Sequence, residues 1–137
     1  MLVYEFTNPH PKGIKTGDCV VRAVSLAFDK DYLEARRDLN KAKRESKFDS
    51  YKDTKFIYDY LKEYERLIIA VERGKPRMKA DEFVGKYGKG TYIVKMAKHI
   101  ACIKNGKLLD TWDSSEKTIY TAWKIEDWSK LEFWFNF

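Results

Sequence analysis

The dipeptide Asn105-Gly106 constrains the fold of this chain more than any other feature of its sequence. It stands between two runs rich in apolar residues, His99–Lys104 and Lys107–Trp112. Asn-Gly tolerates the positive φ angles of a two-residue turn, so its place between these runs predicts an antiparallel hairpin with a fixed register. Further strands are predicted in the same half of the chain, at Thr91–Met96, Thr118–Ile125 and Leu131–Phe137.

The first half of the chain has a helical pattern instead. In Cys19–Phe28 the apolar residues recur at helical spacing and only Arg22 and Ser25 interrupt them, so this helix is predicted to be largely buried. Residues 1–18, which contain the early prolines and glycines, are predicted to form a loop. The remaining predicted elements are helices at Asp31–Ser46, Asp53–Tyr64 and 79–87, and a buried strand at Leu67–Val71.

Helices followed by strands indicate an α+β fold. We expect an N-terminal helical layer, with a central helix that begins at Cys19, packed on a C-terminal antiparallel sheet. The 137 residues fit one domain, 1–137, because no linker or internal repeat divides them. No run approaches the roughly 20 apolar residues of a membrane span, and the N-terminus has no signal-peptide pattern. A cytoplasmic protein without membrane contact is therefore expected.

Cys19 is a candidate nucleophile because of its position in the first turn of the predicted buried helix. Free N–H groups and the helix dipole stabilise a thiolate there. The alternative is that Cys19 is only a small buried apolar residue. With two cysteines and two histidines, the chain has no disulfide framework and no recognisable zinc spacing, so no metal and no cofactor are expected.

The hairpin register brings a candidate base close to a carboxylate. Counted back from Asn105-Gly106, His99 lies opposite Trp112 and diagonal to Asp110, and the three side chains project from one face of the sheet. A carboxylate at that position would fix the orientation of the imidazole. Asp113 falls on the opposite face but lies at the strand end, where register often fails, so it stays an alternative to Asp110.

Two other residues have weaker claims to this site. Cys102 alternates with His99 along the strand and projects from the other face, so a structural role is expected for it. His10 lies between two prolines in the first loop, and no neighbouring residue in the sequence would orient it as a base.

The order of these residues resembles that of papain-like cysteine peptidases. The matching segments are Gly17-Asp18-Cys19 at the helix start, His99-Ile-Ala-Cys-Ile at the strand start and Asp110-Thr111-Trp112 after the hairpin. More closely, the chain resembles small papain-like proteins encoded by phages and bacteria, which combine a G-D-C helix start with a hairpin that ends in D-T-W-D. The resemblance covers roughly residues 8–115.

The resemblance implies a papain-like fold with Cys19 as the nucleophile, His99 as its base and Asp110 as the residue that orients His99. Trp112 would cover the His99–Asp110 pair. Papain-like enzymes usually carry a Gln six residues before the nucleophile as an oxyanion donor, and Gly13 occupies that position here. The wider set of candidate oxyanion and supporting residues is Asn8, Thr16, Asp18, Trp112 and Asp113.

The expected function is hydrolysis of a peptide or isopeptide bond in a peptide or protein substrate, by acyl transfer to Cys19. Two alternatives remain: a transglutaminase- or deamidase-type acyl transferase with the same triad, and a binding or inhibitor protein on a papain-like scaffold. The net charge of +6 and the basic run Lys41–Lys47 would suit a nucleic-acid partner, but acidic residues interleave with basic ones and a solvated helix face is favoured. A phage-encoded protein of this kind would act in the host cytoplasm.

Overall fold

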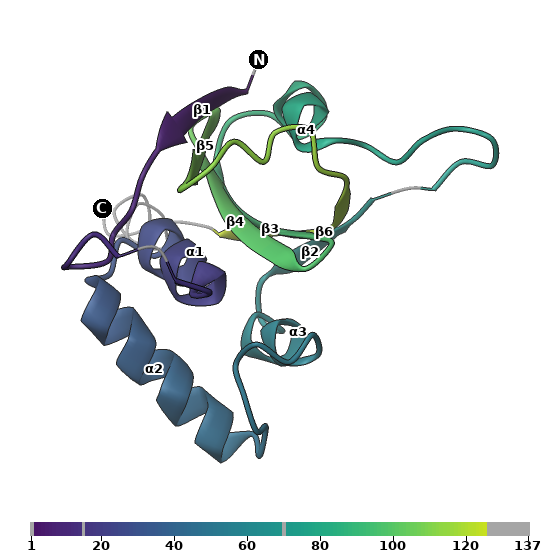
Figure 1. Cartoon of the computed structure of the whole chain (residues 1–137). Helices are drawn as coiled ribbons and strands as arrows, with labels where there is room; N and C mark the ends of the chain where they lie inside the picture. Colours follow the sequence, from purple (N-terminus) through teal and green to yellow (C-terminus); the bar gives the residue numbers. More distant parts are fainter. Residues whose placement is uncertain (1, 15, 70, 126–137) are drawn as a thin grey trace, which may run out of the picture.

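The computed structural model describes residues 2–14, 16–69 and 71–125 of the chain. Within these residues the fold is α+β, as predicted, and its six strands form one mixed sheet in the order β1-β5-β4-β3-β6-β2 (Figure 1). The helices are α1 (Cys19–Ala27), α2 (Tyr32–Glu45), α3 (Phe56–Tyr60) and α4 (Ala80–Tyr87). The strands are β1 (Val3–Phe6), β2 (Glu65–Ile68), β3 (Thr91–Met96), β4 (His99–Lys104), β5 (Lys107–Asp110) and β6 (Ile119–Ile125).

Helix α1 is the central helix of the fold, because it packs between α2 and the middle of the sheet (Figure 1). Its sequence explains this position, since all nine residues except Cys19 and Leu26 are buried. The core beneath α1 includes Ile100 and Cys102 of β4, which alternate toward this face of the sheet. The first helix is thus buried as its apolar pattern predicts.

The opposite face of the sheet is also covered by a helix. Helix α4 contributes Phe83 and Val84 to a second core, where they join Ala101 and Ile103 of β4. The helices therefore do not form the single N-terminal layer that the sequence predicts: α1, α2 and α3 lie on one side of the sheet and α4 on the other (Figure 1). None of the helices in the described ranges is long and apolar enough to cross a membrane.

The sheet differs from the predicted antiparallel sheet at both of its edges. Val3–Phe6 is not loop but strand β1, which pairs in parallel with β5. This pairing joins segments about a hundred residues apart, so no local pattern could predict it. At the other edge, β2 ends at Ile68, whose surface is 77% exposed, so the predicted buried strand is in fact an exposed edge strand.

The third helix is shorter than the predicted Asp53–Tyr64 because the side chain of Asp53 accepts a hydrogen bond from the backbone N–H of Lys55 at 2.9 Å, which forms a turn before α3. The predicted strand Leu131–Phe137 lies outside the described residues.

The hairpin at Asn105-Gly106 forms as predicted. Both turn residues have positive φ, at 52° and 79°, and Lys104 pairs with Lys107. The β4–β5 ladder continues to the pair Cys102–Leu109, and β5 ends at Asp110, two residues earlier than predicted. His99 and Asp110 therefore lie at the open end of the ladder, where their side chains meet the start of α1.

Candidate active site

Cys19 is the first residue of α1 and is partly exposed. Its thiol therefore lies at the end of the helix where backbone N–H groups have no intrahelical acceptor and the dipole favours negative charge. The apolar residues that follow Cys19 bury the rest of the helix and so hold this end in place beside β4. A reactive thiol on a rigid element is what a nucleophile requires.

His99 and Asp110 form a buried hydrogen-bonded pair. The Nε2 atom of His99 and the Oδ2 atom of Asp110 are 2.6 Å apart, and both side chains are nearly inaccessible to solvent. The Trp112 ring lies beside the imidazole with the ring centres 4.8 Å apart, although 44% of Trp112 is exposed. Since Asp110 occupies Nε2, Nδ1 is the ring nitrogen of His99 that is left for proton transfer.

Cys19 and His99 line the same cleft and influence each other's pKa. Burial alone would raise the pKa of the Cys19 thiol, but the hydrogen bonds from His99 and the Ile100 backbone and the positive charges of His99 and Arg22 outweigh it, so this pKa lies below its usual range. Burial alone would lower the pKa of His99, but Asp110 and Cys19 together raise it to about 9. Both changes favour a thiolate–imidazolium pair at neutral pH.

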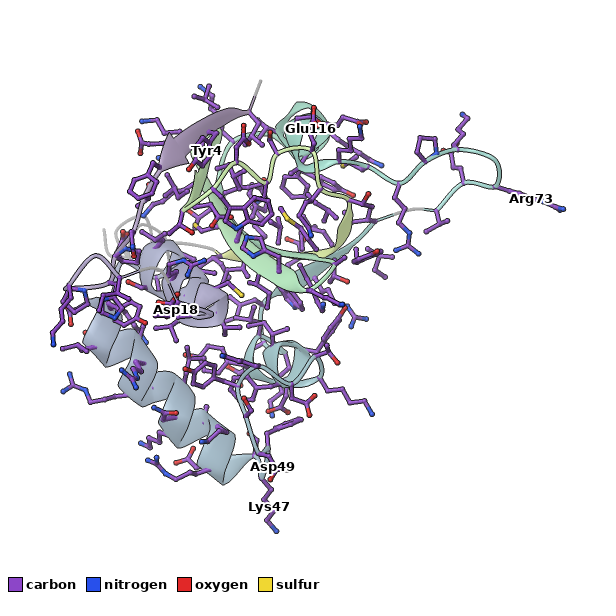
Figure 2. All side chains as sticks on the ribbon, in the orientation of Figure 1. Tyr4, Asp18, Lys47, Asp49, Arg73 and Glu116 are labelled. Atoms are coloured by element: carbon purple, nitrogen blue, oxygen red, sulfur yellow. The ribbon has the colours of Figure 1, made fainter. Side chains whose placement is uncertain are left out.

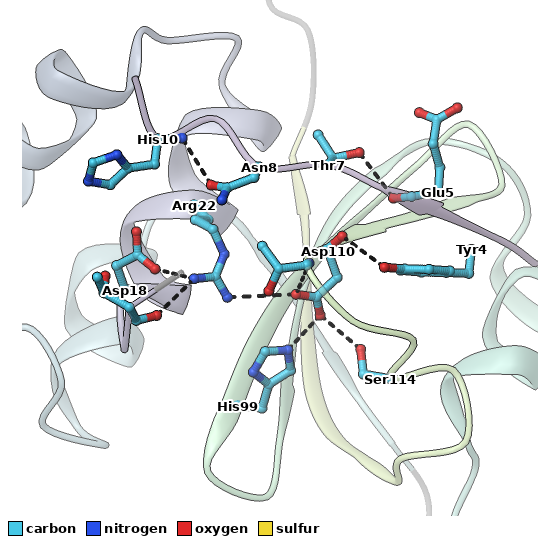
Figure 3. A network of polar contacts seen from close by, with 12 residues as sticks. Tyr4, Glu5, Thr7, Asn8, His10, Asp18, Arg22, His99, Asp110 and Ser114 are labelled. Carbon is cyan, nitrogen blue, oxygen red and sulfur yellow. Dashed lines mark hydrogen bonds and ion pairs between the residues drawn. The ribbon is translucent and has the colours of Figure 1, made fainter. Parts of the chain in front are cut away.

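The carboxylate of Asp110 is held by several partners besides His99 (Figure 3). The hydroxyl of Ser114 donates to Oδ2 at 2.9 Å, and the backbone N–H of Thr111 donates to Oδ1 at 2.8 Å. The guanidinium of Arg22 lies 3.7 Å from Oδ1. These contacts fix the direction in which Asp110 presents its oxygen to the imidazole.

Arg22, like Ser114, contacts Asp110 and was missed by the sequence predictions. It lies one turn after Cys19 on α1, is 6% exposed, and joins Asp110 to a second buried carboxylate, that of Asp18 (Figure 3). Asp18 also accepts a hydrogen bond of 2.6 Å from the Tyr32 hydroxyl, and burial and this bond raise the pKa of Tyr32. The sequence did contain a signal for Arg22: it is the one charged residue in an otherwise apolar helix, and a buried charge needs buried partners.

Cys19 and His99 open into a cleft of about 740 Å³. The cleft runs from the start of α1 to the β3–β4 turn and is closed by the segment before α3 and by Trp112. Its volume would hold several residues of a peptide or another ligand of similar size. Its walls include Thr16, Gly17, Tyr51, Lys52, Asp53, Ile57, Lys95, Lys98, Thr111 and Trp112.

The other predicted supporting residues lie in different places. Thr16 lines the cleft, and its carbonyl accepts a hydrogen bond from Arg22. Asp18 faces the buried Arg22–Tyr32 network. Asn8 is not among the cleft residues, because its side chain bonds the carbonyl of Ile14 and the N–H of His10 within the first loop.

The weaker candidates for the triad lie outside the cleft. Asp113 accepts a hydrogen bond from the N–H of Ser115, and it is Asp110 that contacts His99. His10 packs against the ring of Tyr32. Cys102 is fully buried beneath α1, where burial raises the pKa of its thiol to about 12.

Within the described ranges, no group of three or more His, Cys, Asp and Glu side chains is arranged to hold a metal ion. Comparisons with protein-family models, with curated proteins and with solved structures give no match for this chain.

Proposed function

We propose that this protein is a papain-like cysteine hydrolase that cleaves a peptide or isopeptide bond. One observation carries the proposal: at the wall of the large cleft Cys19 and His99 alter each other's pKa, and His99 is hydrogen-bonded to Asp110. A nucleophile that contacts a base, which in turn contacts an orienting group, is the arrangement that acyl-transfer enzymes share on unrelated folds.

The papain-like part of the proposal is supported by where the three groups come from. The thiol lies at the start of the central helix, the imidazole at the start of a strand, and the carboxylate at the end of the neighbouring strand. Trp112, two residues after Asp110, shields the His99–Asp110 hydrogen bond on one side. These are the positions that the sequence resemblance implies.

The chemistry follows from the two pKa directions. The Cys19 thiolate attacks the carbonyl carbon of the substrate, and the oxygen that becomes negative is stabilised by N–H groups at the start of α1. The carbon–nitrogen bond then breaks as the Nδ1 atom of His99 gives its proton to the leaving amine. His99, now neutral, takes a proton from water as the water attacks the thioester. A carboxylic acid is released and the Cys19–His99 pair is restored.

The alternatives to the hydrolase differ from it in the group that resolves the acyl-enzyme, in the substrate, or in having no acyl-enzyme at all. An amine in place of water at the thioester step would make the protein a transferase with the same acyl-enzyme. A substrate glutamine side chain would make it a deamidase. A binding protein on this scaffold would need no acyl-enzyme, so its interaction with its partner would survive Cys19→Ala.

The first test is the reactivity of the two cysteines in the same molecule. With iodoacetamide at pH 7, we expect Cys19 to be labelled at least about a hundredfold faster than Cys102, because Cys19 has the lowered pKa and Cys102 is buried. His99→Ala should remove most of this difference. Equally slow labelling of both cysteines in the wild-type protein would contradict the proposal.

The second test is cleavage. The wild-type protein is incubated with a mixture of peptides of defined sequence, and products are identified by mass spectrometry. New termini should form with the wild-type protein and not with Cys19→Ala or His99→Ala. Products with a new amide bond or with glutamate in place of glutamine would assign the transferase or the deamidase instead.

A further inference from the structure

Within residues 2–14, 16–69 and 71–125, three lysine side chains line the cleft near Cys19. They are Lys52 in the segment before α3, Lys95 in β3, and Lys98 in the β3–β4 turn. No ion pair joins any of them to a carboxylate of the described part of the chain. Elsewhere on the surface, lysines do find such partners, as Lys30 does with Asp38 at 2.6 Å.

The charge of the cleft is not balanced by its other residues. Asp53 is the acidic residue of the cleft wall, and its Oδ1 atom accepts the backbone N–H of Lys55. Arg22 also lines the cleft, but Asp18 and Asp110 neutralise it. The three lysines therefore leave an excess of positive charge in front of the nucleophile.

Lys52 lies close to the chain just before the nucleophile. Its Nζ atom is 3.4 Å from the point where a Cβ atom on Gly17 would stand. The glycine leaves room for an ammonium group beside the backbone two residues before Cys19. A negatively charged group of a ligand bound in the cleft would be within reach of it.

Lys98 occupies a backbone position that disfavours lysine. It lies in the two-residue turn between the paired residues Met96 and His99, with φ at 53°. Glycine adopts such a φ without strain, whereas a residue with a Cβ atom does not. Strained residues of this kind are common beside functional sites. Here the lysine directly precedes the base and lines the cleft.

We propose that the cleft binds an acidic peptide segment, with aspartate or glutamate side chains flanking the scissile bond and contacting Lys52, Lys95 and Lys98. This inference rests on the proposed function, since it takes Cys19 as the reacting group. The occupant is a peptide, and not a nucleic acid, because the nucleophile and base in this cleft are suited to acyl transfer.

The test compares two alkylating reagents at Cys19, the anionic iodoacetate and the neutral iodoacetamide. Dividing the iodoacetate rate by the iodoacetamide rate removes any change in the thiolate fraction. We expect each lysine removed to lower this ratio about twofold at low salt. This estimate is the attraction in water between one ammonium group and the anionic reagent at a distance on the order of 8 Å. The triple variant Lys52→Gln/Lys95→Gln/Lys98→Gly should lower it about eightfold at low salt and much less at 0.5 M salt, where charges are screened.

Lys98→Gly has a matched control in Lys47→Gly. Lys47 also has a positive φ, at 61°, but it projects into solvent at the end of α2, away from the cleft (Figure 2). Both substitutions relieve the same backbone strain, so both should raise the melting temperature. Only Lys98→Gly should lower the iodoacetate ratio.

The outcomes separate this inference from the proposed function. If Cys19 is labelled rapidly but the ratio is unchanged in the triple variant, the acidic-substrate inference is wrong and the hydrolase proposal stands. If Cys19 is not selectively labelled, the hydrolase proposal fails. In a second assay, a glutamate-rich peptide should protect Cys19 from iodoacetamide better than its glutamine-rich counterpart. Protection by a short single-stranded oligonucleotide alone would overturn the inference in favour of a nucleic acid.

Discussion

Asp110→Asn tests the reasoning about the site most directly, because it removes a charge and keeps the shape of the side chain. In the wild-type protein Asp110 contacts His99 at 2.6 Å, and both groups are buried. Burial by itself lowers the pKa of His99, and Asp110, together with Cys19, outweighs this effect and keeps the imidazole protonated. Without the charge of Asp110 we expect the pKa of His99 to fall.

The size of the effect follows from that pKa. The pKa of His99 is raised from 6.5 to about 9, and this difference is worth about 3 kcal/mol at 1.36 kcal/mol for each pH unit. The equilibrium between imidazolium and imidazole is therefore shifted roughly three-hundredfold by Asp110 and Cys19 together. Because the imidazolium stabilises the thiolate, the pKa of Cys19 should rise in the variant.

The assay is the rate of iodoacetamide labelling of Cys19 between pH 4 and pH 10, with Cys102 as the slow reference in each sample. In the wild-type protein we expect labelling to persist well below the usual thiol pKa. In Asp110→Asn the rate at pH 6 should fall by about ten- to a hundredfold, and the midpoint of the profile should move to higher pH.

Ser114→Ala is the control for this prediction. Ser114 donates a neutral hydrogen bond to the same Oδ2 atom of Asp110, at 2.9 Å, so its removal leaves the charge unchanged. The pH midpoint of Cys19 labelling should move much less in this variant. If Asp110→Asn is folded by circular dichroism and labels Cys19 with the wild-type pH profile, the electrostatic account of the site is wrong.

Three further predictions concern stability. Arg22→Met should cost about 3–5 kcal/mol in urea unfolding, because it leaves the buried carboxylate of Asp18 without its cation and takes one of two cations from Asp110. Lys62→Met on the surface should cost under about 1 kcal/mol. Trp112→Ala should cost less than about 2 kcal/mol in the same assay, because 44% of Trp112 is exposed. It should nevertheless slow Cys19 labelling, because it opens the His99–Asp110 hydrogen bond to water. A larger loss of stability would refute a covering role. In Cys19→Ala, the raised pKa of His99 should stabilise the fold below pH 6.5, by at most about 3 kcal/mol. This contribution should be lost as the pH rises through the pKa of His99 in the folded protein. Melting temperatures that do not change over this pH range would contradict the prediction.

Much of the fold could be predicted from short-range patterns. The apolar spacing in Cys19–Phe28 identified the central helix, since a helix with so little polar surface must be buried. Asn105-Gly106 fixed the hairpin and its first pair, because few other dipeptides adopt two consecutive positive φ angles. The same register predicted that His99 and Asp110 lie close together, since side chains alternate strictly between the two faces of paired strands.

Only the tertiary structure determined what depends on contacts between distant segments. The parallel pairing of β1 with β5 and the position of α4 on the second face have no signal in their own residues. The same holds for one partner of Arg22: Asp18 is four residues away on the same helix start, but Asp110 comes from the end of β5, far along the chain. Local sequence sets backbone conformation and burial, whereas the choice of partner across the fold depends on how the helices and the sheet pack together.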